Sequence, residues 1–244
     1  MTYVMQEGFG ALGIVPPRYV ADNDNVAGTT CCVTGVKTPR LYMETFAPLE
    51  QLPPISGSLN ADIRHGDFME TFTGRKFWPM DPTPDEVHIE DIAHALSMQC
   101  RYAGHCLRFY SVAEHSVLMA WWLYRHAGPA TALQGLLHDA SEAYLVDVPR
   151  PVKPYLTNYK AVEAKVQAVV MERFGLPATM PPAVKEADDR IIGDELANLK
   201  PMDWHAHYDN PLGVTLAYWS PAEAEAKFLA AFEALSDEVR GMAV

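Results

Sequence analysis

The stretch ALQGLLHDASEAYL, residues 132–145, places two adjacent ionisable side chains inside an apolar pattern. The leucines and alanines on either side of His138 and Asp139 indicate that these two side chains lie in or beside the hydrophobic core. Burying a histidine next to an aspartate is unfavourable unless a partner pairs with them or uses them. A divalent metal ion is the simplest such partner, because neutral imidazole and carboxylate are both good ligands.

The composition is that of a globular protein with an acidic balance. The formal net charge of -12 over 244 residues argues against a nucleic-acid-binding surface, because phosphate backbones need clustered Lys and Arg. It leaves room for one small anionic substrate in a local basic pocket. No run approaches 18 apolar residues, and residues 1–10 lack the basic start and apolar region of a signal peptide. We therefore expect a soluble, cytoplasmic protein with no membrane partner.

The chain divides into two parts by its pattern of residues. Residues 1–66 are rich in Gly and Pro and show no sustained helical period, so we expect a partly irregular extension. Residues 67–244 predict an all-α domain preceded by a small β-hairpin around Thr73-Gly74. The expected helices cover Ile89–Tyr102, Val112–Ala127, Pro129–Leu145, Tyr159–Phe174, Pro182–Leu199 and Pro221–Leu235.

Helical spacing identifies two further inward-facing polar side chains. His115 shares a helical face with Val112 and Leu118, although a single inward histidine is more often a hydrogen-bonded core residue than a metal ligand. Asp188 shares a face with Ile191, whereas its neighbour Asp189 falls on the solvent side. An inward, unpaired aspartate is harder to explain as a purely structural residue.

Together these positions supply two imidazoles and two carboxylates from three expected helices. The predicted metal ligands are His115, His138, Asp139 and Asp188. Such a set suits a single divalent ion, with Co, Mn or Zn as first candidates and Fe, Ni and Mg as others. It also leaves coordination positions for water and substrate.

Other polar residues near this set could carry acid–base chemistry or bind a phosphate. Glu142 lies three residues after Asp139 and is placed to act as a base. Asp147 precedes the stiff segment VPRPVK and is either a catalytic acid or a turn residue. Arg101 and Lys153 offer cations, and the alternative for Arg101 is a helix C-terminal charge.

These motifs resemble those of the HD-domain metal phosphohydrolases. Within that superfamily they are most similar to the small bacterial 5′-deoxynucleotidases and to the phage-borne deoxyadenosine triphosphate triphosphohydrolases. The resemblance rests on Arg101-Tyr102, Val112-Ala113-Glu114-His115-Ser116, His138-Asp139-Ala140-Ser141-Glu142, Asp147-Val148-Pro149-Arg150-Pro151-Val152-Lys153 and Val184-Lys185-Glu186-Ala187-Asp188. HD alone is a weak signal, whereas HDxSE followed by DxPxPxK is specific.

The resemblance implies an HD-domain helical bundle that binds one metal ion through the four H/HD/D residues. It also implies that Glu142 positions or activates the attacking water, that Asp147 protonates the leaving oxygen, and that Arg101 holds the phosphate. Tyr102 stands where that subfamily usually has Trp beside the sugar, which leaves the strictness of deoxyribose selection open.

The sequence therefore predicts a hydrolase that removes phosphate from 2′-deoxynucleotides. The first alternative is the same fold releasing triphosphate from deoxynucleoside triphosphates. The second is a nucleotide-binding protein without activity, against which the presence of both Glu142 and Asp147 argues. We expect a dimer or higher homo-oligomer, because this family often dimerises. The sequence alone does not specify the preferred base or the native metal.

Overall fold

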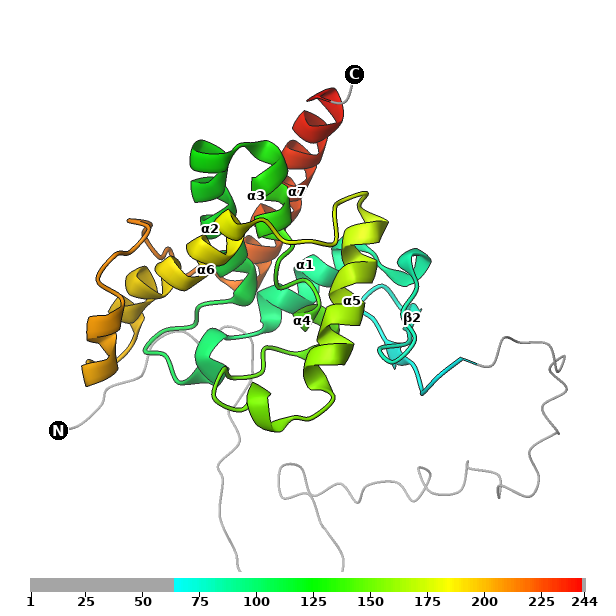
Figure 1. Ribbon diagram of the computed structural model, residues 1–244, viewed down its shortest axis with the longest axis horizontal. Helices are drawn as coiled ribbons and strands as arrows, with labels where there is room; N and C mark the ends of the chain where they lie inside the picture. The colour runs from blue at the N-terminus through cyan, green and yellow to red at the C-terminus, as the bar shows by residue number, and fades with distance from the viewer. Residues whose placement is uncertain (1–63, 243–244) are drawn as a thin grey trace, which may run out of the picture. The chain divides into compact units, whose positions relative to one another are not determined.

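The computed structural model of the protein describes residues 64–242, which form a mostly helical unit (Figure 1). The helical prediction is thus confirmed for this part of the chain. Its α-helices are α1 (Ile89–Met98), α2 (Val112–Ala127), α3 (Pro129–Leu136), α4 (Glu142–Leu145), α5 (Tyr159–Arg173), α6 (Pro182–Glu195) and α7 (Pro221–Met242). Short 3-10 helices are η3 (Pro84–Glu86), η4 (Arg101–Gly104), η5 (Lys153–Tyr155), η6 (Leu196–Asn198) and η7 (Asp203–His207).

The predicted β-hairpin is present but short. Strands β1 (Met69–Glu70) and β2 (Lys76–Phe77) pair antiparallel, with Met69 opposite Phe77. Gly74 has a φ of 75°, the left-handed conformation that glycine adopts most easily in a tight turn. The buried carboxylate of Asp91 on α1 accepts hydrogen bonds from the backbone N–H and the hydroxyl of Thr73. These two hydrogen bonds therefore connect the turn of the hairpin to α1.

The hydrophobic core lies where α1, α2, α3 and α7 meet (Figure 1). Helix α2 is central, because it packs against each of the other three and also against α6. Gly135 permits the close approach of α3 to α2, since a Cβ at this position would lie 2.3 Å from the Leu123 side chain. Any larger residue there would require the end of the Leu123 side chain to move.

The third expected helix, Pro129–Leu145, is wrong as a continuous element. Helix α3 ends at Leu136, and tight turns carry the chain to α4, so His138 and Asp139 lie in turns. The break depends on α5, where the Gln167 side-chain amide donates to the Leu137 carbonyl at 2.7 Å and accepts from the Ser141 N–H at 3.0 Å. Those bonds satisfy backbone groups that the helix no longer pairs.

The first expected helix, Ile89–Tyr102, is also too long. It ends at Met98, because Gln99 and Cys100 are extended and pair with the chain that enters α2. The Gln99 carbonyl accepts from the Val112 N–H at 3.1 Å. Arg101 and Tyr102 consequently lie in η4, and the Tyr102 backbone is left-handed with a φ of 56°.

The predicted extension, residues 1–66, lies almost entirely outside the described residues. Arg64 is described, and its guanidinium pairs with the carboxylates of Asp81 and Glu86, so the described unit begins ahead of the expected boundary at residue 67. No helix within residues 64–242 has the length and apolar character needed to cross a membrane.

Candidate metal centre and catalytic site

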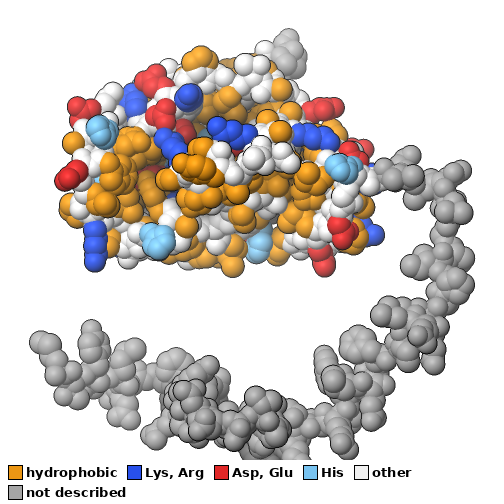
Figure 2. All heavy atoms as spheres, turned by 60° about the horizontal axis from the view of Figure 1, so that its bottom comes forward, with side chains coloured by type: hydrophobic (Ala, Val, Ile, Leu, Met, Phe, Trp, Pro, Cys, Tyr) orange, Lys and Arg blue, Asp and Glu red, His pale blue; other side chains and the backbone are white. Residues whose placement is uncertain are grey.

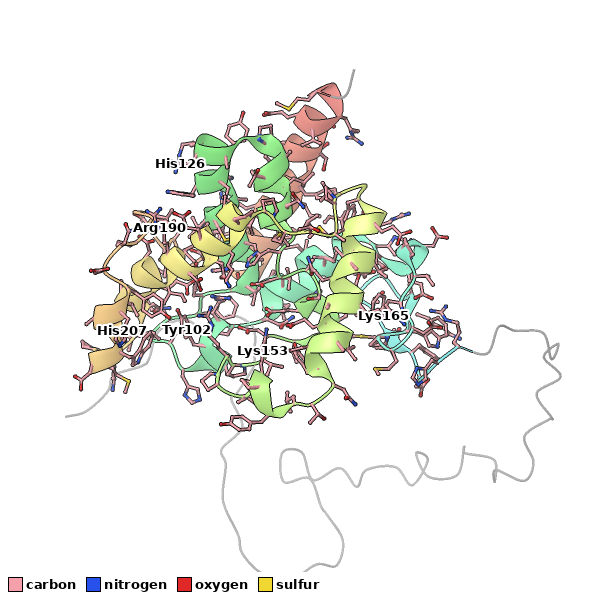
Figure 3. The ribbon with its side chains drawn as sticks, in the orientation of Figure 1. Tyr102, His126, Lys153, Lys165, Arg190 and His207 are labelled. Carbon is pink, nitrogen blue, oxygen red and sulfur yellow. The ribbon has the colours of Figure 1, made fainter. Side chains whose placement is uncertain are left out.

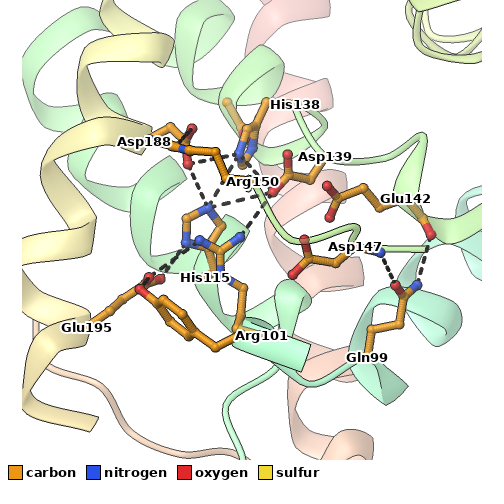
Figure 4. A network of polar contacts seen from close by, with 12 residues as sticks. Gln99, Arg101, His115, His138, Asp139, Glu142, Asp147, Arg150, Asp188 and Glu195 are labelled. Carbon is orange, nitrogen blue, oxygen red and sulfur yellow. Dashed lines mark hydrogen bonds and ion pairs between the residues drawn. The ribbon is translucent and has the colours of Figure 1, made fainter. Parts of the chain in front are cut away.

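The structure brings the four predicted metal ligands together (Figure 4). His115 comes from α2, His138 and Asp139 from the turns after α3, and Asp188 from α6. The two imidazole Nε2 atoms are 3.4 Å apart. Asp139 Oδ2 lies 3.1 Å from His138 Nε2 and 3.8 Å from His115 Nε2. Asp188 Oδ1 lies 3.4 Å from His115 Nε2 and 3.7 Å from His138 Nε2.

These separations fit a shared divalent ion. Nitrogen and oxygen ligands at about 2.1 Å from one ion lie roughly 3.0 to 3.5 Å from each other. His115, His138 and Asp139 each place one ligand atom within 4.8 Å of the others, so they can hold a metal ion. Asp188 adds a carboxylate oxygen next to both imidazoles. The donor set of two imidazoles and two carboxylates suits a first-row transition metal.

Both imidazoles are held so that Nε2 points into the cluster. His138 Nδ1 lies 2.8 Å from the carbonyl oxygen of Gly135, at the end of α3. His115 Nδ1 lies 2.7 Å from Oε1 of Glu195, whose side chain is fully buried at the end of α6. A carboxylate or carbonyl behind a histidine fixes its tautomer and makes the other nitrogen a better ligand.

The charges around the cluster keep its acids ionised. Burial opposes ionisation of Asp139, but the charge and hydrogen bond of His138, together with the charge of His115, outweigh burial and lower the pKa of Asp139 to about 2. Burial also opposes ionisation of Glu195, yet the charges of Arg101 and His115 lower its pKa to about 2. The site therefore presents carboxylates rather than carboxylic acids, which is the form that binds a cation.

The candidate acid and base lie beside the cluster. Figure 4 shows the carboxylates of Glu142 and Asp147 pointing toward the same space near Asp139. Glu142 is only 4% exposed, and its Oε2 has no hydrogen-bond partner within residues 64–242. Burial, together with the charges of Asp139 and Asp147, raises the pKa of Glu142 to about 9. Burial likewise raises the pKa of Asp147. Two carboxyls with elevated pKa values next to a metal cluster are typical of acid–base groups.

The cations predicted for substrate are already engaged with carboxylates. Arg101 lies 3.5 Å from Asp139 and 3.4 Å from Glu195, and its buried Nε has no acceptor among the described residues. Lys153 Nζ lies 3.3 Å from Glu142 and 2.8 Å from Glu163. Arg101 can thus still donate to an incoming anion, whereas Lys153 is already paired with both Glu142 and Glu163.

Tyr102 makes a hydrogen bond at the site that the sequence did not predict. Its hydroxyl donates to the Glu195 carboxylate, which also contacts Arg101 and His115. The Tyr102 side chain lines the cavity described below. It therefore connects the cavity wall with the buried carboxylate that holds a metal ligand, in addition to any contact with a sugar.

A cavity of about 990 Å³ opens beside the cluster and includes Asp139, Glu142, Asp147 and Asp188 in its lining. Figure 2 shows Lys and Arg side chains gathered beside hydrophobic side chains on one face of the molecule. In Figure 3, Tyr102 lies between Lys153 and His207 of η7 in the view shown. The volume is sufficient for a nucleotide-sized ligand, since small-molecule sites usually occupy about 300 to 1,000 Å³.

Two bacterial proteins are similar to this chain. It is 42% identical over 132 residues to YfdR of Escherichia coli K12, which covers 54% of this chain and 72% of YfdR. It is 34% identical over 188 residues to a protein of Rhodobacter capsulatus, which covers 69% of this chain and 95% of that protein. The chain belongs to the same protein family as these two. Both relatives are described as uncharacterized, and no model of a known protein family matches the sequence.

Two polar residues of the site were not found from the sequence. Glu195 follows Asp188 by seven residues, a spacing that returns to the same helical face, and this spacing could have identified it. Gln99 donates to the Glu142 carbonyl and accepts from the Asp147 N–H, both at 2.9 Å. The sequence did not indicate that Gln99 lies beside these residues, because its position depends on α1 ending at Met98.

Glu195 offers a test of how the metal cluster is supported. We expect Glu195→Gln to weaken metal binding by roughly 10- to 100-fold, since the amide is a poorer acceptor for the His115 N–H. Isothermal titration of the metal-free protein with Zn²⁺ or Mn²⁺ measures the change. Glu186→Gln on the same helix, at an exposed position paired with Arg190, is the matched control and should bind metal as the wild type does. Equal affinities for all three proteins would contradict a supporting role of Glu195.

The residue before Asp147 has a strained backbone. Val146 has φ 60° and ψ 155°, a region that is nearly restricted to glycine and costs about 1 to 3 kcal/mol. Its side chain is 59% exposed and gains little from packing. The Val146 carbonyl accepts from the Tyr159 hydroxyl, and Gln99 holds the next N–H, so contacts on both sides impose the conformation.

Val146→Gly is therefore expected to raise the free energy of unfolding by up to about 1 kcal/mol. The relieved strain exceeds the gain in freedom of the unfolded chain at this position. Urea denaturation at neutral pH measures the difference. Val148→Gly is the control, because Val148 is part-buried with an ordinary backbone and should lose stability. A Val146→Gly protein that is as destabilised as the control would show that the turn stores no strain.

Proposed function

We propose that this protein is a metal-dependent phosphohydrolase of the HD-domain type that releases orthophosphate from 2′-deoxynucleoside 5′-monophosphates. One observation carries the proposal: Asp139 of a cluster able to hold a metal ion lines the same cavity as two carboxyls with raised pKa values, Glu142 and Asp147. A ligand-storage site has no need for an acid–base pair beside its metal. The nucleotide substrate itself is inferred from the resemblance of the motifs.

The proposed hydrolysis needs metal ligands, a base and an acid, and different residues of the site would serve as each. His115, His138, Asp139 and Asp188 would hold a divalent ion, which when bound would polarise the phosphoryl group as a Lewis acid and lower the pKa of water. With a divalent ion bound, whose charge would favour the carboxylate form, Glu142 is placed to orient the attacking water and accept its proton. Asp147, which burial keeps easier to protonate, is placed to give a proton to the leaving oxygen.

Arg101 and Lys153 have different parts in this scheme. The free Nε–H of Arg101 can donate to a phosphate oxygen while its two terminal nitrogens stay on Asp139 and Glu195. Lys153 stabilises the ionised form of Glu142, since its Nζ is the nearest cation to that carboxylate. A phosphate bound at Arg101 would therefore lie next to both the metal cluster and the base.

The charges of the cavity lining favour an anionic ligand such as the phosphate group of a nucleotide. Four side-chain cations, Arg101, Arg150, Lys153 and Lys200, face the four acids Asp139, Glu142, Asp147 and Asp188. The raised pKa values of Glu142 and Asp147 favour the neutral form of these two acids, and a divalent ion would add two positive charges. The choice of a monophosphate over a triphosphate rests on the resemblance of the motifs.

Product analysis by phosphorus NMR separates these substrates. With the metal-loaded protein we expect orthophosphate from dAMP and no triphosphate from dATP. Release of intact triphosphate from dATP, with dAMP left unchanged, would contradict the proposal and favour a triphosphohydrolase. Tight nucleotide binding without either product would instead favour a binding protein.

A further inference from the structure

The cavity has a second wall that the proposed chemistry does not use. Residues 199–208, which follow α6, contribute side chains to the cavity that Asp139 and Asp188 of the metal cluster also line. Apart from Lys200 and His205 the wall is apolar and aromatic, in contrast to the carboxylates of Asp139 and Glu142 across the lining. Its lining residues are Leu199, Lys200, Met202, Trp204, His205 and Tyr208.

The aromatic rings of this wall form a compact group. The Trp204 ring meets His205 edge-on at 4.4 Å between centroids and Tyr208 at 5.7 Å. Trp204 is 36% exposed although it lines the cavity, so part of its indole surface is open to a ligand. His205 Nε2 is buried and has no hydrogen-bond partner within residues 64–242. A ring nitrogen in this state is free to pair with a polar edge of a bound molecule.

The wall is held against α6 by specific contacts. Gly193 permits the close approach, because a Cβ there would lie 2.9 Å from the Tyr208 carbonyl oxygen. Arg190 donates to the carbonyls of Asn210 and Pro211, both at 3.1 Å. Asp194 accepts from the Leu212 N–H at 2.8 Å. The backbone at Tyr208 and the residues that follow it are thus held by the same helix that carries Asp188.

We propose that the wall formed by residues 199–208 binds the base of the nucleotide, with the Trp204 indole against the ring and His205 Nε2 at its polar edge. This inference rests on the proposed function, since it assigns the leaving alcohol of the same reaction. A planar base can stack on the Trp204 indole and pair with His205 Nε2, whereas a simple sugar phosphate would contact neither group in this way. Purines offer the larger stacking surface, so they are the favoured bases.

The test compares a substrate that has a base with one that does not. For the metal-loaded wild type, we expect kcat/KM for dAMP to exceed that for 2-deoxyribose 5-phosphate by at least about tenfold, since stacking on an aromatic side chain is worth roughly one power of ten or more. In Trp204→Ala this ratio should fall by about tenfold. Trp121→Ala is the matched control, because Trp121 is 42% exposed but lies outside the cavity lining, and it should keep the wild-type ratio.

A second measurement needs no catalysis. 2′-Deoxyadenosine, which has no phosphate, is titrated into the metal-free protein while tryptophan fluorescence is followed. The wild type and Trp121→Phe should show saturable quenching that Trp204→Phe loses, and His205→Ala should weaken the binding severalfold. Quenching with no phosphate release from any substrate would uphold the base site and reject the hydrolase.

Two results would overturn the base site. One is equal hydrolysis of dAMP and 2-deoxyribose 5-phosphate by the wild type, which would leave the hydrolase standing. The other is a Trp204→Ala protein with an unchanged ratio and unchanged binding of 2′-deoxyadenosine.

Discussion

Asp188→Ala is expected to remove bound metal and abolish phosphate release, whereas Asp189→Ala is expected to retain both. The two aspartates are neighbours on α6 and are chemically identical. Asp188 Oδ1 lies within 3.7 Å of both imidazole Nε2 atoms, but Asp189 points to Arg150 near the surface. Loss of Asp188 removes one of the two anionic ligands and leaves both imidazoles without its carboxylate, so the affinity for a divalent ion should drop and activity should fall at least about a thousandfold.

The measurement for this pair is metal content by atomic emission, together with phosphate release from dAMP. The wild type and Asp189→Ala should each contain about one ion per chain after reconstitution, and Asp188→Ala should contain almost none. Circular dichroism establishes that both variants keep the helical fold. Equal metal content in the two variants would contradict the assignment of Asp188 as a ligand.

Glu142→Gln is expected to make the protein more stable and nearly inactive. The pKa of Glu142 is raised from 4.5 in the unfolded chain to about 9 in the folded protein. Between these two pKa values the carboxyl group is ionised in the unfolded chain but protonated in the folded protein, so the free energy of unfolding falls as pH rises. A glutamine side chain does not titrate in this range and avoids this loss of stability. We expect a gain on the order of 1 to 3 kcal/mol at pH 7 that disappears below about pH 4.5.

Activity should change in the opposite direction, because glutamine cannot accept a proton from water. We expect phosphate release to fall by roughly 100-fold or more. Thermal unfolding of the metal-free proteins between pH 4 and 9 measures the stability change. Glu163→Gln is the control, since Glu163 also pairs with Lys153 but lies outside the cavity lining, and it should gain no stability. A Glu142→Gln protein that is less stable at pH 7 or retains most of its activity would contradict the role of Glu142.

The sequence indicated one cluster of His115, His138, Asp139 and Asp188, and the structure brings these four side chains close together. The apolar neighbours of Asp188 separated it from Asp189, because the side of a helix that carries Ile191 must face the core. His115 was identified by the same reasoning on its own helix. His138 and Asp139 were identified by the cost of burying adjacent ionisable groups, since they lie in turns and not on a helix. Their role as metal ligands stays a prediction.

The sequence did not predict the features that depend on tertiary contacts. The apolar pattern continues from α3 into α4, so the break at Leu136 became visible only through Gln167 on α5. The early end of α1 likewise depends on pairing between Cys100 and Ser111. Both deviations position the site, since one turns His138 and Asp139 toward α6 and the other places Arg101 beside Glu195.

Metal titration of the metal-free protein tests directly whether phosphate release depends on a bound divalent ion. Phosphate release from dAMP is measured as Mn²⁺, Co²⁺ or Zn²⁺ is added, with Asp139→Ala as the blank. We predict that orthophosphate release rises with added metal, saturates near one ion per chain and stays absent in Asp139→Ala. Release that is independent of metal, or a wild type that equals Asp139→Ala on every nucleotide, would contradict a metal-dependent phosphohydrolase.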